Sequence, residues 1–470
     1  MESMEASLIH DWMKIDSWIT GEAWVGSRIS DHVRYLCEEV GPRWASSDGE
    51  RRAVEYIRGQ MAEIGLSGAT LEEFPLRTWE HGDAVGHVDG IDRQIDLLPF
   101  LYAPPVDISA TLVDVGFGMP HELLSVADQL EGSVVIVNLT LEPFSPAIPL
   151  PVRLAAIAKA GAAVAVVVER KSGKRVEYHS ATDWRKDLVE GNSGEHPLPT
   201  FITSREDGGL LRSMASESRK LSIKMDARHY SSTGINTVAE LDGTSYPGEY
   251  LVLEAHHDTV PDSPGGNDNA SGTAVVMDVA RVLARLQAET GVAPGCGIRF
   301  ITFSAEEQLL QGSEAYAERH YGPEPLPRLG INLDEVSTGH MKGIALQFPH
   351  LRSLIQEQLD SMNEDLKCHV LAEFDPSGDI FSFARRGIPV GFPWRWRFVG
   401  KHPDADYHHE PGDTADKVRP RELKVFVAFL ARLLLRLSKV APEEWPENPL
   451  NVEDIERGII DEIGRAPRWL

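Results

Sequence analysis

From about residue 233 to residue 440, short and nearly continuous apolar runs alternate with longer runs of helical period. Strands buried on both faces have this composition, because helices cover both sides of a mostly parallel sheet. The alternation therefore predicts an α/β fold in which a mostly parallel sheet is sandwiched by helices. The predicted strands are 250–255, 298–303, 329–334 and 388–392, and the predicted helices are 272–287, 313–319, 350–362 and 422–440.

The rest of the chain differs from this pattern and predicts three further segments. Residues 1–94 contain helical patterns and the start of the same domain. Residues 95–232 contain short β-rich runs, turns and one helix, which predicts a smaller inserted β-rich domain. Residues 441–470 carry eight acids and three arginines in one helical pattern, so we expect an acidic tail packed on the surface.

Charge and cysteine content exclude several classes of protein. The 470 residues include 46 lysines and arginines and 72 aspartates and glutamates, for a net charge of −26. This charge repels nucleic acid and anionic lipid, and no apolar run reaches the length of a membrane span. The three cysteines are too far apart for a disulfide framework or a cysteine-bound zinc. The first twenty residues do not resemble a signal peptide, so we expect a cytoplasmic protein.

Residues that can perform chemistry follow the predicted strands. Histidine and acidic residues come after the first three strands, a glycine-rich loop precedes the first helix, and a His-His pair lies far downstream. Open α/β sheets place their sites beyond the carboxyl ends of the strands, so we expect these side chains to meet. The residues are His256, His257, Asp258, Glu306, Glu307, Asp334, Glu335, Asp268 in loop 265–272, and His408 and His409 in loop 406–414.

These residue types suit two divalent cations. Mixed imidazole and carboxylate ligands favour zinc, and two ions about 3.5–4 Å apart need a bridging carboxylate. Asp268 is a candidate bridge because its glycine-rich turn lets the backbone approach closely. Glu306 and Glu307 are adjacent, so one can bind a metal while the other acts as a general base. Asp258, two residues after His256, can orient that imidazole.

Each feature alone also has an ordinary structural explanation. An acidic pair at a strand end is usually a solvated rim, a His-His pair is usually part of a surface loop, and Asp334 alone could cap a helix. The glycine-rich loop lacks lysine and is neither GxGxxG nor a P-loop, which argues against nucleotide binding. One two-metal site explains all the positions together, and we favour it for that reason.

The ordered motifs resemble peptidase family M28, the dizinc aminopeptidases. They are His-x-Asp, Gly-x-x-Asp-x-Ala-Ser-Gly, Glu-Glu, Asn-Leu-Asp and His-x-x-x-Asp-Thr, spread over residues 233–440. The resemblance implies a zinc-aminopeptidase (phosphorylase-like) fold. Gly-Pro-Arg at 41–43, followed by a helix, is similar to the N-terminal portion of the family. Residues 154–162 resemble its protease-associated domain, which would then be the insert at 95–232.

The resemblance also implies a role for each metal-binding position. His256 and Asp334 would hold one zinc, Glu307 and His409 would hold the other, and Asp268 would bridge the two.

Two further roles and one choice follow from the same motifs. Glu306 would be the general base, and Asp258 would orient the first histidine. His409 is preferred to His408 as the ligand because it lies four residues before Asp413, as the family motif requires.

The function implied by the resemblance is a zinc-dependent aminopeptidase. Two Zn²⁺ ions, with Mn²⁺ or Co²⁺ as alternatives, would activate water against the N-terminal bond of a peptide or small amide substrate. A carboxypeptidase, an amidohydrolase or a one-zinc glutaminyl cyclase on the same scaffold are rival hypotheses. The complete ligand set argues against an inactive receptor-like protein. An arginine in 392–398 could pair with an acidic substrate group or pack within a loop, and a homo-oligomer is left open.

Overall fold

The computed structural model of the protein describes residues 2–183, 186–187, 196–322, 324–337, 339–371, 378–396 and 407–464. The chain divides into two compact units. The first unit comprises Met1–Leu76 and Ser232–Ile459, and the second comprises Arg77–Ser231 and Ile460–Leu470. Each unit contains a hydrophobic core of its own.

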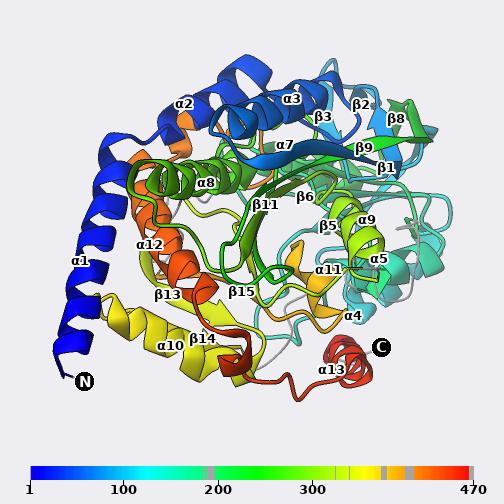
Figure 1. Ribbon diagram of the computed structural model, residues 1–470. Coiled ribbons are helices and arrows are strands. Elements are labelled where there is room, and N and C mark those ends of the chain that lie inside the picture. Colours follow the sequence, from blue (N-terminus) through cyan, green and yellow to red (C-terminus); the bar gives the residue numbers. More distant parts are fainter. Residues whose placement is uncertain are drawn as a thin grey trace. The chain divides into compact units, whose positions relative to one another are not determined.

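An eight-stranded sheet forms the centre of the first unit, in the order β1-β9-β11-β10-β12-β15-β13-β14 (Figure 1). The central strand β10 runs parallel to β11 and β12, and β12 runs parallel to β15. Strands β9 and β13 run antiparallel to β11 and β15, respectively. The strands are β1 Ser67–His81, β9 Ala227–Leu241, β10 Tyr250–His256, β11 Gly297–Phe303, β12 Gly330–Asn332, β13 His340–Leu346, β14 Lys367–Val370 and β15 Val390–Trp396.

The helices predicted between these strands are confirmed, and the α/β class with them. Helices α8 and α12 pack against each other and against β10 and β11, and their apolar side chains fill much of the core. Helix α8 ends at Gly291, whose φ of +75° is the left-handed C-cap that glycine adopts without strain. The helices are α2 Ile29–Arg34, α3 Asp48–Glu63, α8 Ser271–Thr290, α9 Gln311–His320, α10 Arg352–Ser361, α11 Ile380–Ala384, α12 Pro420–Ser438 and α13 Val452–Gly464.

The N-terminal pattern forms helix α1, Glu2–Val25. Its buried side chains Ile19 and Ala23 join the core of the first unit. Asp16 pairs with Arg436 of α12 at 2.7 Å, and the helix contacts both α8 and α12. The first of the helical patterns predicted in residues 1–94 is therefore a helix that packs on the body of its unit. Among the described helices, none is both long enough and apolar enough to cross a membrane.

The second unit contains a closed barrel with strand order β2-β3-β7-β6-β5-β4-β8. The barrel includes β2, which precedes residue 95, because β2 pairs with both β3 and β8. Its core is dominated by valine, leucine and isoleucine from β5, β6 and α5. Its elements are β2 Ala84–Val88, β3 Gln94–Pro99, β4 Val106–Asp114, β5 Val134–Asn138, β6 Val164–Val168, β7 Thr200–Thr203 and β8 Lys220–Met225, with helices α4 Pro120–Ser125, α5 Leu150–Lys159 and α7 Arg205–Ser216.

Candidate functional site

The register of the parallel strands brings the predicted residues to one edge of the sheet. Glu254 of β10 lies opposite Asn332 of β12, so His256 and Asp334, each two residues further on, leave the sheet at the same level. His256 Nε2 lies 3.4 Å from Asp334 Oδ1. Strand β11 ends at Phe303, opposite His256, and the two glutamates follow it. The carboxyl edge therefore gathers acids and an imidazole, as the sequence predicts.

Close backbone packing explains the glycines in the loop that carries Asp268. A Cβ on Gly272 would lie 2.2 Å from the carbonyl oxygen of Leu333, and a Cβ on Gly266 would lie 2.6 Å from that of Thr414. Any larger residue at either position would push the loop away from the segment that ends in Asp334 or from the segment after His409. The glycines therefore bring three parts of the site together.

Two buried side chains fix the backbone of this loop. The Asp413 carboxylate accepts hydrogen bonds of 2.9 Å from the backbone N–H groups of both Asn267 and Asp268. The Arg43 guanidinium donates to the carbonyl oxygens of His257, at 2.8 Å, and of residues 264 and 265, at 2.6 and 3.1 Å. Arg43 is fully buried. Both residues lie in motifs of the sequence, Arg43 in Gly-Pro-Arg and Asp413 in His-x-x-x-Asp-Thr. Neither motif predicts this positioning role.

The two oxygens of Asp268 face different groups of donors. Oδ1 lies 3.2 Å from His256 Nε2, which in turn lies beside Asp334. Oδ2 lies 3.3 Å from His409 Nε2, and the same nitrogen lies 3.0 Å from Glu307 Oε2. One carboxylate thus connects two sets of potential ligands, which is the arrangement that a bridge between two cations requires.

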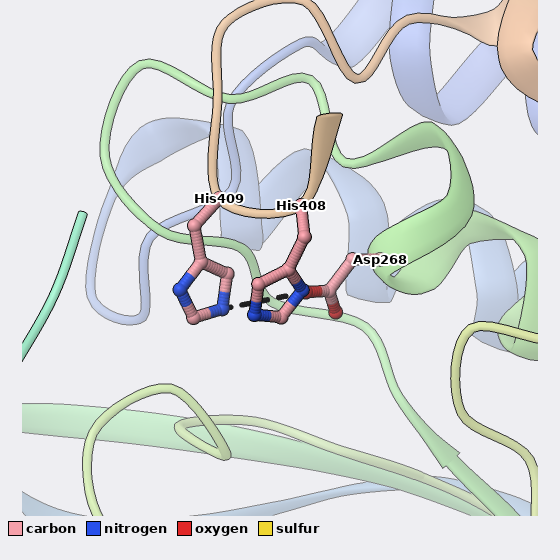
Figure 2. A group of neighbouring side chains, drawn as sticks. All are labelled: Asp268, His408 and His409. Atoms are coloured by element: carbon pink, nitrogen blue, oxygen red, sulfur yellow. Dashed lines mark ion pairs between the residues drawn. The ribbon is translucent and has the colours of Figure 1, made fainter. Parts of the chain in front are cut away.

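His408 and His409 both lie beside Asp268, with their rings stacked at 3.7 Å (Figure 2). His408 Nδ1 is 3.0 Å from Asp268 Oδ2 and 3.3 Å from Glu335 Oε1. The side chain of His408 is 45% exposed and that of His409 is 20% exposed. The deeper position of His409 and its contact with Glu307 agree with its predicted role as the ligand, whereas His408 lies at the rim.

The remaining predicted residues lie behind the donors. His256 Nδ1 is 3.2 Å from the carbonyl oxygen of Asp258 and 3.5 Å from its carboxylate Oδ1. That carboxylate also accepts a 3.1 Å hydrogen bond from the backbone N–H of Glu306. His257 points elsewhere, because its Nδ1 lies 3.0 Å from the hydroxyl of Thr302. These contacts support the predicted orienting role of Asp258. His257, in contrast, contacts Thr302 within the sheet and not the predicted donors.

Charge at the site is dominated by buried acids. Burial raises the pKa of Glu306 well above its usual range, although the nearby His256 opposes this shift. Burial also raises the pKa of Glu307, against the effect of His409. For Asp268 burial acts in the same direction, but hydrogen bonds from three histidines hold its pKa well below the usual value. For His256, burial lowers the pKa, but the surrounding carboxylates raise it well above 6.5.

The donor atoms fit a pair of divalent cations. Glu307 Oε1 is buried without a hydrogen-bond partner among the described residues, and the buried atoms His256 Nε2 and Asp334 Oδ1 have only ion-pair contacts with other predicted donors. A buried polar atom that lacks a partner costs free energy, and a bound cation removes this cost. Imidazole nitrogen and carboxylate oxygen are also the ligands that zinc takes at catalytic sites. The residues present therefore suit the metal ions that the sequence implies.

Donors of this kind, shared through one carboxylate, are typical of a class of metal-dependent hydrolases. The family model described as Peptidase family M28 matches residues 236–434. This segment contains every predicted donor and is similar to that peptidase family.

The relatives include proteins named carboxypeptidase and proteins named aminopeptidase. Carboxypeptidase Q of Bos taurus is 24% identical over 414 residues, covering 86% of this chain and 84% of its own. Aminopeptidase YwaD of Bacillus subtilis is 26% identical over 321 residues, and the match covers 67% of this chain and 62% of YwaD.

Solved structures of low sequence identity share the fold. A Peptidase M28 precursor from Shewanella amazonensis has a TM-score of 0.75 at 20% identity, covering 94% of this chain and 100% of its own. The zinc aminopeptidase BSAP from Bacillus subtilis has a TM-score of 0.69 at 21% identity, and the match covers 92% of this chain and 98% of BSAP.

We predict that Asp268→Ala reduces bound metal to well below two equivalents and abolishes hydrolysis. The carboxylate offsets the repulsion between two dications, so its loss destabilises both metal sites. Elemental analysis of the purified variant checks this outcome, with circular dichroism to confirm folding. A folded variant that still binds two full equivalents would place the bridge elsewhere.

A second prediction separates the stacked histidines. His409→Ala should lose one metal equivalent, because its Nε2 contacts both Asp268 and Glu307. His408→Ala is the matched control and should retain both metals, since its ring lies at the rim. Metal content measured on the two variants in parallel decides between them. The reverse result would exchange the roles of the two histidines.

Proposed function

We propose that the protein is a two-zinc exopeptidase that hydrolyses the N-terminal peptide bond of its substrate. The observation that carries this proposal is the geometry of Asp268, whose two oxygens face separate groups of ligands. A single-ion site would have no need for a shared carboxylate, which argues against a one-zinc cyclase.

His256 and Asp334 would hold one ion, Glu307 and His409 the other, and Asp268 both. When bound, the ions supply Lewis acidity and an activated water. Zinc is favoured by the mixed nitrogen and oxygen donors and by the zinc aminopeptidase that shares the fold. Manganese and cobalt can use the same donors and are the alternatives that elemental analysis tests.

Glu306 is our candidate for the general base. It follows β11 at the edge where the donors meet, and its backbone N–H is fixed by Asp258 at 3.1 Å. Its carboxylate would accept the proton of the attacking water and donate it to the nitrogen of the leaving amine. Asp258 would meanwhile hold His256 in a single orientation.

A carboxypeptidase on the same scaffold is the second candidate. The relatives named carboxypeptidase Q match 85–86% of this chain, against 67% for aminopeptidase YwaD. An amidohydrolase would share the same chemistry with a non-peptide substrate. An inactive binding protein is disfavoured because the full donor set and Glu306 are all retained.

A panel of matched substrates tests these alternatives. An aminopeptidase should hydrolyse leucine p-nitroanilide, which has a free α-amine, and should not hydrolyse its N-acetyl derivative. Hydrolysis of N-acetylated peptides with a free carboxylate would instead establish a carboxypeptidase. The same preparation should contain two zinc equivalents by elemental analysis.

Three finer features of the prediction are also part of this proposal. Helices α8 and α12 on one side of the sheet and α9 and α11 on the other support the sandwiched zinc-aminopeptidase arrangement (Figure 1). The closed barrel and the sequence of 154–162 support a protease-associated domain. The three cysteines are buried free thiols, which supports a reducing compartment such as the cytoplasm.

We predict that Glu306→Gln keeps both metals but lowers kcat by roughly 10²–10⁴-fold, the usual contribution of a general base. The amide is nearly isosteric with the carboxylate but has no basicity at neutral pH, and KM should change little. Glu307→Gln is the matched control and should lose one metal, because a neutral amide is a poor zinc ligand. Metal content and kcat measured side by side would refute the assignment if Glu306→Gln lost a zinc or kept a near-normal kcat.

A further inference from the structure

A second cluster of candidate metal ligands lies in the barrel unit, beside the end of β6. It consists of Glu169, Glu177 and His179, and one donor atom from each residue lies within 4.8 Å of the other two. All three residues belong to the second unit, and none of them is among the donors of the candidate catalytic centre. The cluster combines one imidazole with two carboxylates, which is again the mixture that favours zinc.

Backbone hydrogen bonds attach both ends of this segment to the barrel. Glu169 directly follows β6, and its N–H donates a 3.0 Å hydrogen bond to the carbonyl oxygen of Thr203 in β7. The carbonyl oxygen of His179 accepts a 2.9 Å hydrogen bond from the N–H of Leu101, which follows β3. The cluster is therefore supported by strands of the barrel, and strands hold ligands in place more precisely than free loops do.

The side chain of Glu169 is the observation that points to a bound ion. Glu169 is 2% exposed, and its Oε2 is buried without a hydrogen-bond partner among the described residues. Its Oε1 accepts hydrogen bonds from the backbone N–H groups of Arg170, at 2.6 Å, and Lys171, at 3.1 Å. These two bonds fix the carboxylate and leave one oxygen for another partner. A buried polar atom without a partner costs free energy, and a cation would remove this cost.

The other two members of the cluster already lie at the spacing of metal ligands. His179 Nε2 is 3.3 Å from Glu177 Oε1. Two ligands of a tetrahedral zinc ion lie about 3.3 Å apart when each bond to the metal is about 2.0 Å long. The side chain of Glu177 is 8% exposed and that of His179 is 23% exposed, so an ion can enter from the side of the histidine.

Lys171 is a competing cation at this position. Its ammonium group pairs with Oε2 of Glu177, and both side chains are buried. This ion pair uses only one oxygen of Glu177, because Oε1 is the atom beside His179. With both carboxyl groups ionised, the side chains of Glu169, Glu177, Lys171 and His179 carry two negative charges and one positive charge. The ammonium alone therefore does not balance the cluster, and a divalent cation would reverse its charge.

We propose that Glu169, Glu177 and His179 bind one further divalent cation of the zinc type, and that this ion stabilises the barrel unit. The inference goes beyond the proposed function and does not depend on it. Residues 169–179 form no helix or strand, so the ion would connect the two ends of a loop directly. Such a cross-link lowers the entropy of the unfolded chain and adds the free energy of metal binding to that of folding.

Elemental analysis of the full-length protein, after zinc loading and gel filtration, tests the site. The wild type should contain one zinc equivalent more than Glu169→Gln, because the amide keeps an acceptor for the backbone N–H groups but is a poor zinc ligand. His179→Gln should lose the same equivalent. The double variant Asp268→Ala/Glu169→Gln should contain one equivalent less than Asp268→Ala, since the two sites share no ligand.

Thermal unfolding separates a metal ligand from a residue that is only structural. With zinc, the Tm of Glu169→Gln should lie roughly 5–10 °C below that of the wild type, as expected for the loss of a ligand that nearly saturates its site. After treatment with EDTA the two proteins should unfold at the same temperature. A purely structural role of Glu169 would instead lower Tm equally with and without zinc.

Glu217→Gln is the matched control, because Glu217 is an exposed glutamate of the same unit that pairs with Arg219 at 2.9 Å. It should keep the zinc content and the Tm of the wild type. If Glu169→Gln does not fold, the zinc content of His179→Gln against the wild type decides the question. Equal zinc content in the wild type and in the folded variants, or a Tm difference that EDTA leaves unchanged, would overturn the proposal. A wild type that hydrolyses no peptide would overturn the proposed function and leave this comparison intact.

Discussion

Asp268 can face two groups of donors because buried hydrogen bonds fix the loop that carries it. A loop between a strand and a helix lacks ladder partners for its backbone, and each buried group left unsatisfied costs about 1–3 kcal/mol. Asp413 satisfies two N–H groups of the loop, and Arg43 satisfies the carbonyl oxygens of 264 and 265. The same guanidinium donates to the carbonyl oxygen of His257, immediately after the predicted ligand His256. The geometry of the candidate metal centre therefore depends on side chains outside the predicted donor set.

This rigidity has to resist strong repulsion. Several carboxylates lie buried at the same edge, and burial raises the pKa values of Glu306 and Glu307. Without fixed backbone, like charges would move apart and the donor distances would widen. Bound cations reverse this balance, because each one is attracted by every acid around it. Metal binding and the stability of this part of the fold are consequently linked.

The sheet could be predicted well from the sequence, because strands and helices depend on local patterns, and the structure brings the candidate donors to one edge of that sheet. The strands that end at His256 and Phe303 are continuous apolar runs, and their polar ends mark the edge where a site forms. The positioning role of Arg43 could not be predicted, since its partners at the candidate site, the carbonyl oxygens of His257 and Pro264, lie more than 200 residues away in the sequence. The closure of the barrel through β2 and β8 is equally non-local. In the sequence, only the four-residue spacing between His409 and Asp413 favours His409 over His408 as the ligand. The structure adds a physical reason, which is the contact between His409 and Glu307.

Substrate choice depends on a different part of the structure from the chemistry. The motifs that resemble peptidase family M28 carry the candidate donors, and they are compatible with cleavage at either end of a peptide. Two opposite charges flank Asp334: Glu335 follows it in the chain, and Arg395 bonds to its carbonyl oxygen from β15. Glu335 also lies 3.3 Å from the imidazole of His408. The side chains on the two sides of Asp334 therefore differ in charge and in their contacts, whereas the candidate donors are the same for cleavage at either end. Strand register fixes how far β15 extends beyond β12, and it thereby decides which side chains lie beside the candidate metal centre.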